Sequence, residues 1–238
     1  MVSIICCTIR DRYMHNVFRN YNRQKVKKKE MIVVLNHDDM NARKWRRAAR
    51  KYANVKIYQV PESYELGRCL NYGIRKAKYN IIAKFDDDDY YAPDYLAESL
   101  SAIKKRTASV VGKKTSYMYF EDQRALMLYR RNEENKYCGK LKGGTLVFRK
   151  SVWKKVKFDE KRKYGSDAHF LKKCKRKGFK LYSVSKSNYV CMRRKDTSTH
   201  TQKRSVKKFM SLCRMIRRTD DYASLISKRY PFARKVKA

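Results

Sequence analysis

The chain has 238 residues, 42% of them hydrophobic, which is enough for one domain around a continuous core. Its 61 Lys and Arg outnumber 22 Asp and Glu, and the formal net charge of +39 attracts polyanions without identifying one. The sequence contains no low-complexity segment, no internal repeat and no apolar stretch near the roughly 20 residues of a membrane span, which excludes a repeat protein and a transmembrane protein.

Apolar runs alternate with helical patterns over the first third of the chain. Helices are expected at three places, residues 11–24, 41–53 and 66–78. Strands are expected before and between them, at residues 2–9, 31–35, 55–60 and 81–85. Strands separated by helices predict a parallel, doubly wound α/β sheet.

The pattern changes from about residue 94 onward. A helix at residues 94–105 is followed by strand-like segments at residues 108–112, 116–120, 125–130 and 144–149. We expect this half to form a mixed sheet packed beside the first. In the tail, residues 203–217 place apolar side chains on one face of a basic helix, which either docks on the domain or lies on a membrane surface.

Four consecutive aspartates, Asp86–Asp89, follow the predicted strand at residues 81–85. In an open α/β sheet the ligand crevice lies outside the carboxyl ends of the strands. If the chain stays extended, Asp86 and Asp88 point to the same side and can share one divalent cation, Mn²⁺ or Mg²⁺, which then bridges a diphosphate. The alternative is a solvated acidic loop or a helix cap. The metal site is favoured because the chain is otherwise poor in acidic residues.

The seven cysteines show no C-x-x-C spacing, and Cys6 and Cys7 lie in an apolar run. We therefore expect reduced thiols, no zinc site and a cytoplasmic location. The N-terminal residues lack both a basic region and a long apolar region, so no signal peptide is expected. The basic tail adds the alternative of peripheral attachment to a membrane surface.

The aspartate run resembles the D-x-D element of family 2 glycosyltransferases of the GT-A fold, in which an apolar strand ends in D-x-D-D. Ser3–Thr8 resembles the opening strand of that family, with Cys7 in place of a frequent proline, and Glu30–Val34 resembles the second strand. The family's Asp-Asp-Gly-Ser is replaced by Leu35–Asp38. The resemblance covers roughly residues 1–200 and is greatest to the spore-maturation type of bacterial glycosyltransferase.

The resemblance implies a nucleotide-sugar donor, with a uridine diphosphate sugar favoured. Asn36 or Asp38 would replace the carboxylate that reads uracil, although Asp38 could instead cap the next helix. The segment Gly67–Gly73 resembles the family's G-x-x-x-x-N-x-G, but its glycines could serve only turns and packing, and Arg68 could be a plain surface cation. The implied donor-binding residues are Thr8, Arg10, Asn36, Asp38, Gly67, Arg68, Asn71, Asp86 and Asp87.

The second half supplies the implied acceptor site and base. Gly143–Arg149 resembles the strand beside the acceptor pocket, and the residues expected there are Gly143, Gly144 and Thr145. Tyr164–Phe170 resembles the segment that carries the catalytic base, which would be Asp167, a residue that could also cap a helix. His200 lies about where many GT-A enzymes supply a histidine to the metal, or it is an ordinary surface histidine.

The resemblance also implies the architecture, a Rossmann-like GT-A fold whose mixed, mostly parallel sheet is flanked by helices. One glycosyltransferase domain is expected over residues 1–200, with a nucleotide-sugar half at 1–92 and an acceptor half at 93–200. A basic helical tail would occupy residues 201–238. The expected reaction is inverting transfer of a sugar to an acceptor hydroxyl. Candidate acceptors are DNA, an anionic cell-envelope polymer or a molecule on a membrane surface.

Two other functions are compatible with the sequence. A non-catalytic nucleic-acid-binding protein would use the basic clusters at residues 23–29 and 172–177 and stack bases on some of the 19 tyrosines, but four adjacent carboxylates would repel nucleic acid. A metal-dependent nucleotidyltransferase or nuclease would use the same carboxylates. Metal-dependent release of a nucleoside diphosphate separates the glycosyltransferase from both.

Overall fold

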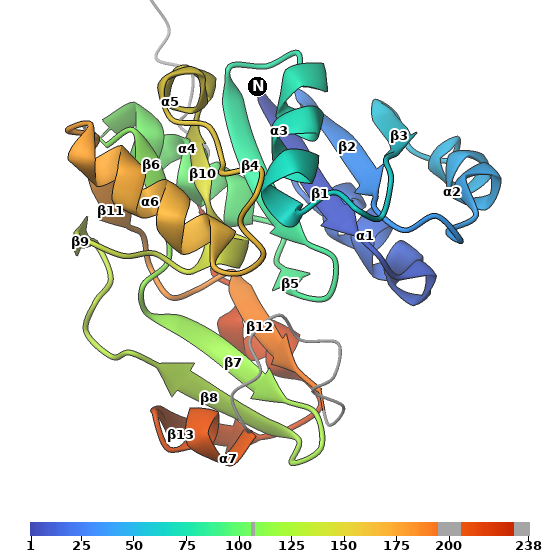
Figure 1. Ribbon diagram of the computed structural model, residues 1–238. Coiled ribbons are helices and arrows are strands. Elements are labelled where there is room, and N and C mark those ends of the chain that lie inside the picture. Colours follow the sequence, from blue (N-terminus) through green and yellow to red (C-terminus); the bar gives the residue numbers. More distant parts are fainter. Residues whose placement is uncertain (106–107, 195–205, 231–238) are drawn as a thin grey trace, which may run out of the picture.

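A central eight-stranded sheet organises the chain (Figure 1). The computed structural model describes residues 1–105, 108–194 and 206–230. The strands lie in the order β3–β2–β1–β4–β10–β6–β11–β9. Their bounds in chain order are β1 Val2–Thr8, β2 Lys29–Leu35, β3 Val55–Gln59, β4 Ile81–Asp86, β6 Val110–Gly112, β9 Lys136–Tyr137, β10 Val147–Arg149 and β11 Leu181–Ser183.

The first four strands are parallel, as their spacing with helices predicts. The connecting helices are α1 (Met14–Asn22), α2 (Ala42–Ala49) and α3 (Leu66–Lys76). Strand β10 then runs antiparallel between β4 and β6, so the sheet is mixed. The prediction of a mostly parallel central sheet flanked by helices is therefore confirmed.

Alternate residues of the strands fill two separate cores, one on each face of the sheet. On β1, Ile4 joins the core under α1 and α4 (Tyr95–Lys105), whereas Ile5 joins the core under α3, α5 (Lys150–Lys155) and α6 (Ser166–Arg176). This alternation is the two-residue period of a strand covered on both sides, and it explains why the strands read as continuous apolar runs. In Figure 1, α3 and α6 lie in front of the sheet.

A second sheet of five strands extends from the first, in the order β13–β8–β7–β12–β5 (Figure 1). Its members are β5 Tyr90–Tyr91, β7 Ser116–Phe120, β8 Ala125–Tyr129, β12 Tyr189–Arg193 and β13 Cys213–Arg218. Strand β5 follows the four aspartates directly, so the second sheet begins where β4 ends. Of the strand predicted at residues 144–149, the structure forms a 3₁₀ turn at Gly143–Thr145 and then β10.

The predicted helix at residues 203–217 is wrong for most of its described length. The structure has a short helix, α7 (Val206–Met210), then strand β13 antiparallel to β8, and then helix α8 (Tyr222–Ile226). Phe209 and Cys213 pack in one cluster with Met118, so a helix turn followed by a strand buries side chains that the helical spacing also places on one face. The described part of the tail, residues 206–230, thus adds a strand to the second sheet and is not a single helix.

Within the described residues, no helix is long and apolar enough to cross a membrane. All seven cysteines lie in described positions and are free thiols, as expected from their spacing.

Candidate active site

Four carboxylates lie at the carboxyl end of β4, beside the end of β1, and each has different surroundings. The side chains are 37% exposed for Asp86, 14% for Asp88 and 5% for Asp87, and Asp89 is also buried. Adjacent buried carboxylates would repel one another strongly in a low-dielectric site. The fold relieves this repulsion with cations and hydrogen-bond donors drawn from distant parts of the chain.

Asp87 is held by Thr8, the last residue of β1, and by Arg10, which lies two residues further along the chain. Thr8 Oγ1 donates a hydrogen bond of 2.5 Å to Oδ2, and Arg10 donates from Nε to the same oxygen at 3.2 Å and from Nη2 to Oδ1. Burial raises the pKa of Asp87, and the charge of Asp88 raises it further, against the lowering effect of Arg10 and Thr8. Thr8 and Arg10 therefore lie in the predicted site, where they bind this carboxylate.

Asp88 lies between two arginines. Its Oδ2 accepts hydrogen bonds from Arg10 Nη2 at 3.1 Å and from Arg194 Nη1 at 2.9 Å. Burial acts to raise the pKa of Asp88, but the two guanidinium groups outweigh it and the pKa is lowered. Both guanidinium groups also lie over the ring of Tyr13, at 4.6 Å for Arg10 and 5.0 Å for Arg194. The carboxylate is thus held in its charged form.

Asp89 connects the site to the second sheet. The hydroxyl of Tyr189 donates to its Oδ2, and the backbone N–H of Met192 donates to Oδ1 at 3.0 Å. Burial raises the pKa of Asp89 to about 8, with the charges of Asp88 and Asp86 as further causes. Strand β12 is thereby fixed against the aspartate run.

The glycines of the predicted acceptor segment leave room for these carboxylates because they carry no side chain. A Cβ on Gly144 would lie 2.7 Å from Asp86 Oδ2 and 2.8 Å from Asp89 Oδ2, so a side chain there would displace one of them. The carbonyl of Gly144 accepts a 2.6 Å hydrogen bond from Tyr91, whose hydroxyl in turn accepts one from the Asp86 N–H. The turn at Gly143–Thr145 therefore forms one wall of the aspartate site.

The predicted base, Asp167, reaches the same place from the first turn of α6. Its Oδ2 lies 3.3 Å from Nζ of Lys84, and Lys84 also donates to Asp86 Oδ1 at 2.5 Å. Asp167 Oδ1 is buried and has no hydrogen-bond partner in the part of the chain that the structure describes. Burial raises the pKa of Asp167, and Lys84 opposes that shift. The N-cap position of α6 belongs to Gly165, so the interpretation of Asp167 as the cap is wrong.

Asn36 and Asp38 lie at the same edge of the sheet, just after β2. The Asn36 backbone N–H donates to the Thr8 carbonyl at 2.9 Å, and its side chain donates to the Pro61 carbonyl at 2.7 Å. Asp38 accepts a hydrogen bond from the Glu62 N–H at 3.2 Å and remains exposed. Helix α2 is capped by the next asparagine in the chain, at position 41, so Asp38 does not cap it.

In the segment Gly67–Gly73 the glycines allow close packing and Asn71 is buried, which corrects the donor role predicted for Asn71, whereas the donor roles of Gly67 and Arg68 stay predictions. The Asn71 side chain is fully buried, and its amide donates to the Phe158 carbonyl at 3.0 Å and accepts from the Trp153 ring at 2.8 Å. A Cβ on Gly67 would collide with the backbone carbonyl of Asp159, and one on Gly73 would meet the β1 and β2 side chains beneath α3. Exposed Arg68 stacks on a neighbouring tyrosine ring, 3.6 Å from its centroid.

Several functional residues were missed by sequence reasoning. Lys84 could have been found from the sequence, because a lysine within a predicted buried strand is rarely buried without a partner of opposite charge. Arg194 and Tyr189 come from β12 and its end, and no local pattern connects them to the aspartates. From α1, Asn16 donates to the Asp87 carbonyl at 2.7 Å and Asn20 donates to the Asp89 carbonyl at 2.8 Å, on one helix face four residues apart.

The two aspartates predicted as metal ligands form ion pairs with different basic side chains. Asp86 contacts Lys84, and Asp88 contacts Arg10 and Arg194. His200 lies outside the described residues. No cluster of three or more His, Cys, Asp or Glu side chains suited to a metal occurs within the described ranges.

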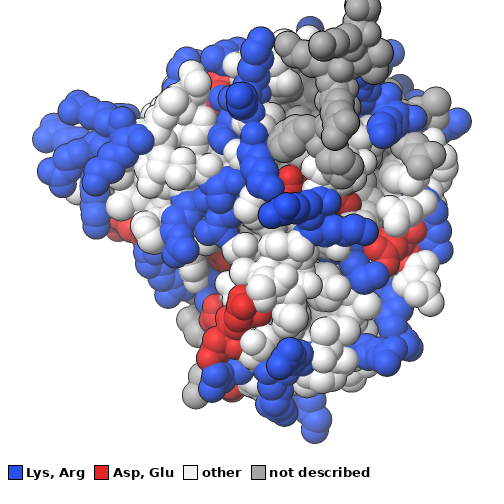
Figure 2. Space-filling view, turned by 180° about the vertical axis from the view of Figure 1, so that it is seen from behind, with Lys and Arg blue, Asp and Glu red and all other residues white. Residues whose placement is uncertain are grey.

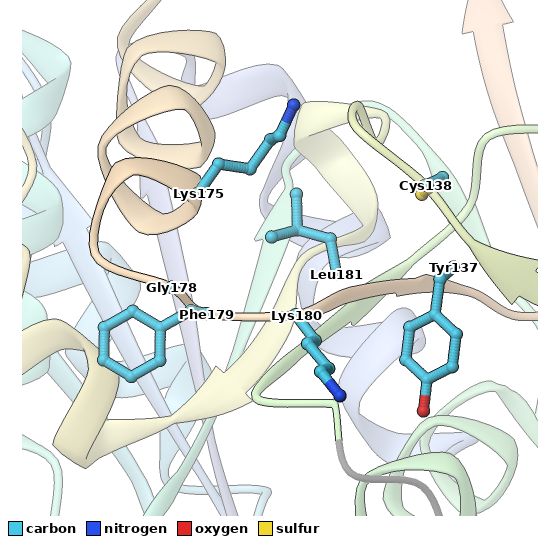
Figure 3. A pocket seen from close by; sticks show the side chains of 7 residues that line it. All are labelled: Tyr137, Cys138, Lys175, Gly178, Phe179, Lys180 and Leu181. Atoms are coloured by element: carbon cyan, nitrogen blue, oxygen red, sulfur yellow. The ribbon is translucent and has the colours of Figure 1, made fainter.

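A cavity of about 350 Å³ lies apart from this chemistry, at the β9–β11 edge near the end of α6 (Figure 3). Its lining residues are Tyr137, Cys138, Lys175, Gly178, Phe179, Lys180 and Leu181. None of the carboxylates described above contributes to it. The candidate active site is therefore the aspartate cluster at the strand ends, where ligands of open α/β sheets bind.

A mostly parallel sheet whose fourth strand ends in a D-x-D-D run has the GT-A fold, and solved structures share it. The chain is similar to TarS residues 1–349 from S. aureus in complex with UDP-GlcNAc, with a TM-score of 0.66 and 18% identity over 89% of this chain and 64% of that one. A mannosyltransferase, PcManGT from Pyrobaculum calidifontis in complex with GDP-Man and Mn²⁺, gives a TM-score of 0.62 and 16% identity over 84% and 58%. The chain spans less than two thirds of each of these chains.

Residues 3–161 match the profile of glycosyl transferase family 2. The chain therefore belongs to this family, as the sequence motifs predicted. No curated protein sequence matches it. The narrower resemblance to spore-maturation glycosyltransferases stays a prediction.

Proposed function

We propose that the protein is an inverting, metal-dependent glycosyltransferase that moves a sugar, of hexosyl type, from a nucleotide-sugar donor to an acceptor hydroxyl. The observation that carries the proposal is the convergence of three segments on one point. Lys84 Nζ lies 2.5 Å from Asp86 Oδ1 and 3.3 Å from Asp167 Oδ2, and 3.4 Å from the carbonyl oxygen of Gly143. A donor-side carboxylate, a candidate base and the predicted acceptor wall thus meet at the carboxyl edge of the family's sheet.

The carboxylates of Asp86 and Asp88 fit a divalent cation that takes its remaining ligands from the diphosphate of the nucleotide sugar. Mg²⁺ in phosphoryl-handling sites is commonly bound by one or two carboxylates plus substrate phosphates, rather than by a cage of protein ligands. Asp86 and Asp88 supply oxygen ligands of that kind. The side chain of Asp86 is 37% exposed, more than those of Asp88 at 14% and Asp87 at 5%. When bound, Mn²⁺ or Mg²⁺ neutralises the charge that grows on the diphosphate leaving group.

The chain's own residues supply the proton transfer. Asp167 accepts the proton of the acceptor hydroxyl as that oxygen attacks the anomeric carbon from the face opposite the diphosphate. The bond from the anomeric carbon to the diphosphate oxygen breaks in the same step, so the configuration inverts. Asp167 Oδ1, without a partner among the described residues, is the oxygen left to accept this proton.

A uridine diphosphate sugar is the proposed donor. Support comes from the sequence resemblance and from Asn36, whose backbone N–H donates to the Thr8 carbonyl at the carboxyl edge of the sheet, with exposed Asp38 two residues further along the chain. TarS was solved with UDP-GlcNAc, whereas PcManGT was solved with GDP-Man, so the fold accommodates both nucleobases. The proposed acceptor is polyanionic, in keeping with the +39 charge, and the proposed location is the cytoplasm or the surface of a membrane.

A donor screen tests the proposal. Melting temperature and nucleoside diphosphate release are measured with UDP-, GDP-, dTDP- and ADP-sugars, with and without Mn²⁺. A bound donor stabilises the fold by mass action, by about 2.7 kcal/mol at a hundredfold excess over its Kd. We expect metal-dependent stabilisation and nucleoside diphosphate as the product. Nucleoside monophosphate or pyrophosphate would indicate a nucleotidyltransferase, and the absence of any metal-dependent donor effect would leave nucleic-acid binding as the better function.

A further inference from the structure

Lys84 is a charged residue in the middle of the central sheet. It is 4% exposed, its chain neighbours Ala83 and Phe85 are buried, and it pairs in register with Ile5 of β1. Burying an ammonium group has a large desolvation cost, and an apolar side chain of the same size often gives an equally stable or more stable protein. Stability therefore does not explain a lysine at this position.

The ammonium group has three donors, and the structure offers three acceptors from three segments. They are Asp86 Oδ1 on β4 at 2.5 Å, Asp167 Oδ2 on α6 at 3.3 Å and the Gly143 carbonyl at 3.4 Å. A Cβ on Gly143 would collide with the Asp167 carboxylate, so the missing side chain lets α6 approach. Lys84 thus links both ends of the proposed reaction centre.

Asp167 depends on this lysine more than a structural carboxylate does. Lys84 is its polar side-chain partner, and its other oxygen has none among the described residues. The second fully buried lysine, Lys113, shows the structural arrangement for comparison. It pairs with Glu98 at 3.1 Å, and Glu98 is held independently by the backbone N–H and the hydroxyl of Ser185.

We propose that Lys84 is a positioning residue, which holds Asp167 by Oδ2 beside Asp86 and leaves Oδ1 to accept the proton of the acceptor hydroxyl. The inference rests on the proposed function and deepens it. A base displaced by about 1 Å loses on the order of a hundredfold in rate, whereas donor binding does not require it. Removing the lysine should therefore separate turnover from donor affinity.

Three variants test this role: Lys84→Met, Lys84→Arg and the matched control Lys113→Met, each of which keeps a long side chain. Donor affinity is measured by calorimetry in Mn²⁺, and kcat is measured as nucleoside diphosphate release with water as the acceptor. We expect Lys84→Met to lower kcat about 100-fold with a donor Kd within threefold of the wild type. Lys84→Arg should recover to within tenfold of the wild-type kcat, and Lys113→Met should stay within threefold while its melting temperature falls.

Two results would overturn the proposal: a Lys84→Met kcat within threefold of wild type, or a loss of donor affinity as large as the loss of kcat. A second measurement needs no activity. In a double-mutant cycle of Lys84→Met and Asp167→Asn followed by urea unfolding, we expect at least about fivefold non-additivity in the unfolding equilibrium constant. If the wild type releases no nucleoside diphosphate from any donor, the proposed function fails, and additivity in this cycle would then separately refute the link between Lys84 and Asp167.

Discussion

At the scale of single residues, the site divides its carboxylates between two tasks. Asp87 and Asp89 are buried and held by Arg10 and by Tyr189, so they shape the turn after β4. Asp86 and Asp167 share the ammonium group of Lys84, and among the described residues Asp167 Oδ1 has no hydrogen-bond partner. The same residue type thus has a structural or a chemical role according to its neighbours.

The role of Asp167 as base is tested by Asp167→Asn. An amide keeps the shape of the carboxylate and can still accept a hydrogen bond from Lys84, but it does not take a proton. Turnover should fall by about 10²–10⁴, the usual range for a positioned base, while donor affinity stays within about threefold. Single-turnover nucleoside diphosphate release and calorimetry measure the two quantities. Transfer near the wild-type rate would mean that Asp167 has only a structural role.

Asp88→Asn tests the donor side and also has a structural consequence. The carboxylate compensates Arg10 and Arg194, so without it two guanidinium groups lose a charged acceptor. We expect at least tenfold weaker donor binding in Mn²⁺ and, without metal, a free energy of unfolding lowered by about 1–3 kcal/mol. Calorimetry and urea unfolding check both, with the exposed Glu121→Gln as a control of equal charge change. Unchanged donor affinity would remove Asp88 from the site.

The sequence could locate this site but could not assign every partner in it. The aspartate run was predictable because four adjacent acids after a buried strand are rare in so basic a chain. The motif predicts a nucleotide-sugar contact for Asn71, but a motif does not show whether a side chain is buried. In the structure the Asn71 amide instead donates to the Phe158 carbonyl and so holds that loop. Arg194 and Tyr189 are more than 90 residues from the aspartates, and contacts over such separations depend on strand pairing.

At the scale of elements, the four parallel strands were predictable because each is covered on both faces and therefore apolar throughout. The second sheet was harder to predict, since most of its strand pairings are not sequential. Strand β12 pairs with β7 and β5, and β13 pairs with β8 across some 85 residues of chain. The helix predicted for the tail is wrong because β13 is an exposed edge strand whose apolar residues do not alternate with polar ones, in keeping with the register shift between Met215 and Arg217.

The tail assignment gives a prediction of its own. Phe209 is buried against the second sheet with Met118 and Phe120, whereas Ile216 on β13 is 45% exposed. Phe209→Ala should lower the free energy of unfolding by about 3–5 kcal/mol, and Ile216→Ala by less than about 1 kcal/mol. Urea unfolding of the full chain measures both. A helix on a membrane surface would use the two side chains alike, so equal small losses would contradict the docked arrangement.

At the scale of the whole molecule, basic side chains are spread over the face seen in Figure 2 between uncharged and acidic areas, and a dense group of them projects at the edge formed by α2. That helix and its end carry six basic residues and no acidic one: Arg43, Lys44, Arg46, Arg47, Arg50 and Lys51. All six are exposed, and none has an ion-pair partner among the described residues. Because no large apolar side chain is exposed between them, this surface suits a soluble polyanion better than insertion into a lipid bilayer.

The last prediction joins this charge to the acceptor. If the acceptor is a polyanion bound partly by α2, its affinity should fall log-linearly with salt, because each phosphate contact releases a counterion. Combining Arg43→Gln, Arg46→Gln and Arg47→Gln should reduce the salt slope for poly(glycerol phosphate) or duplex DNA by about 2–3. The control of equal charge combines Lys172→Gln, Arg176→Gln and Lys177→Gln, in the C-terminal half of α6 and just beyond it. Donor affinity should change much less over the same salt range, since charges in the partly buried site are screened less.

Anisotropy titrations measure binding, and transfer is compared between these polymers and a neutral glycan. Efficient, salt-insensitive transfer to the neutral glycan would refute a polyanionic acceptor and leave the proposed glycosyltransferase activity intact.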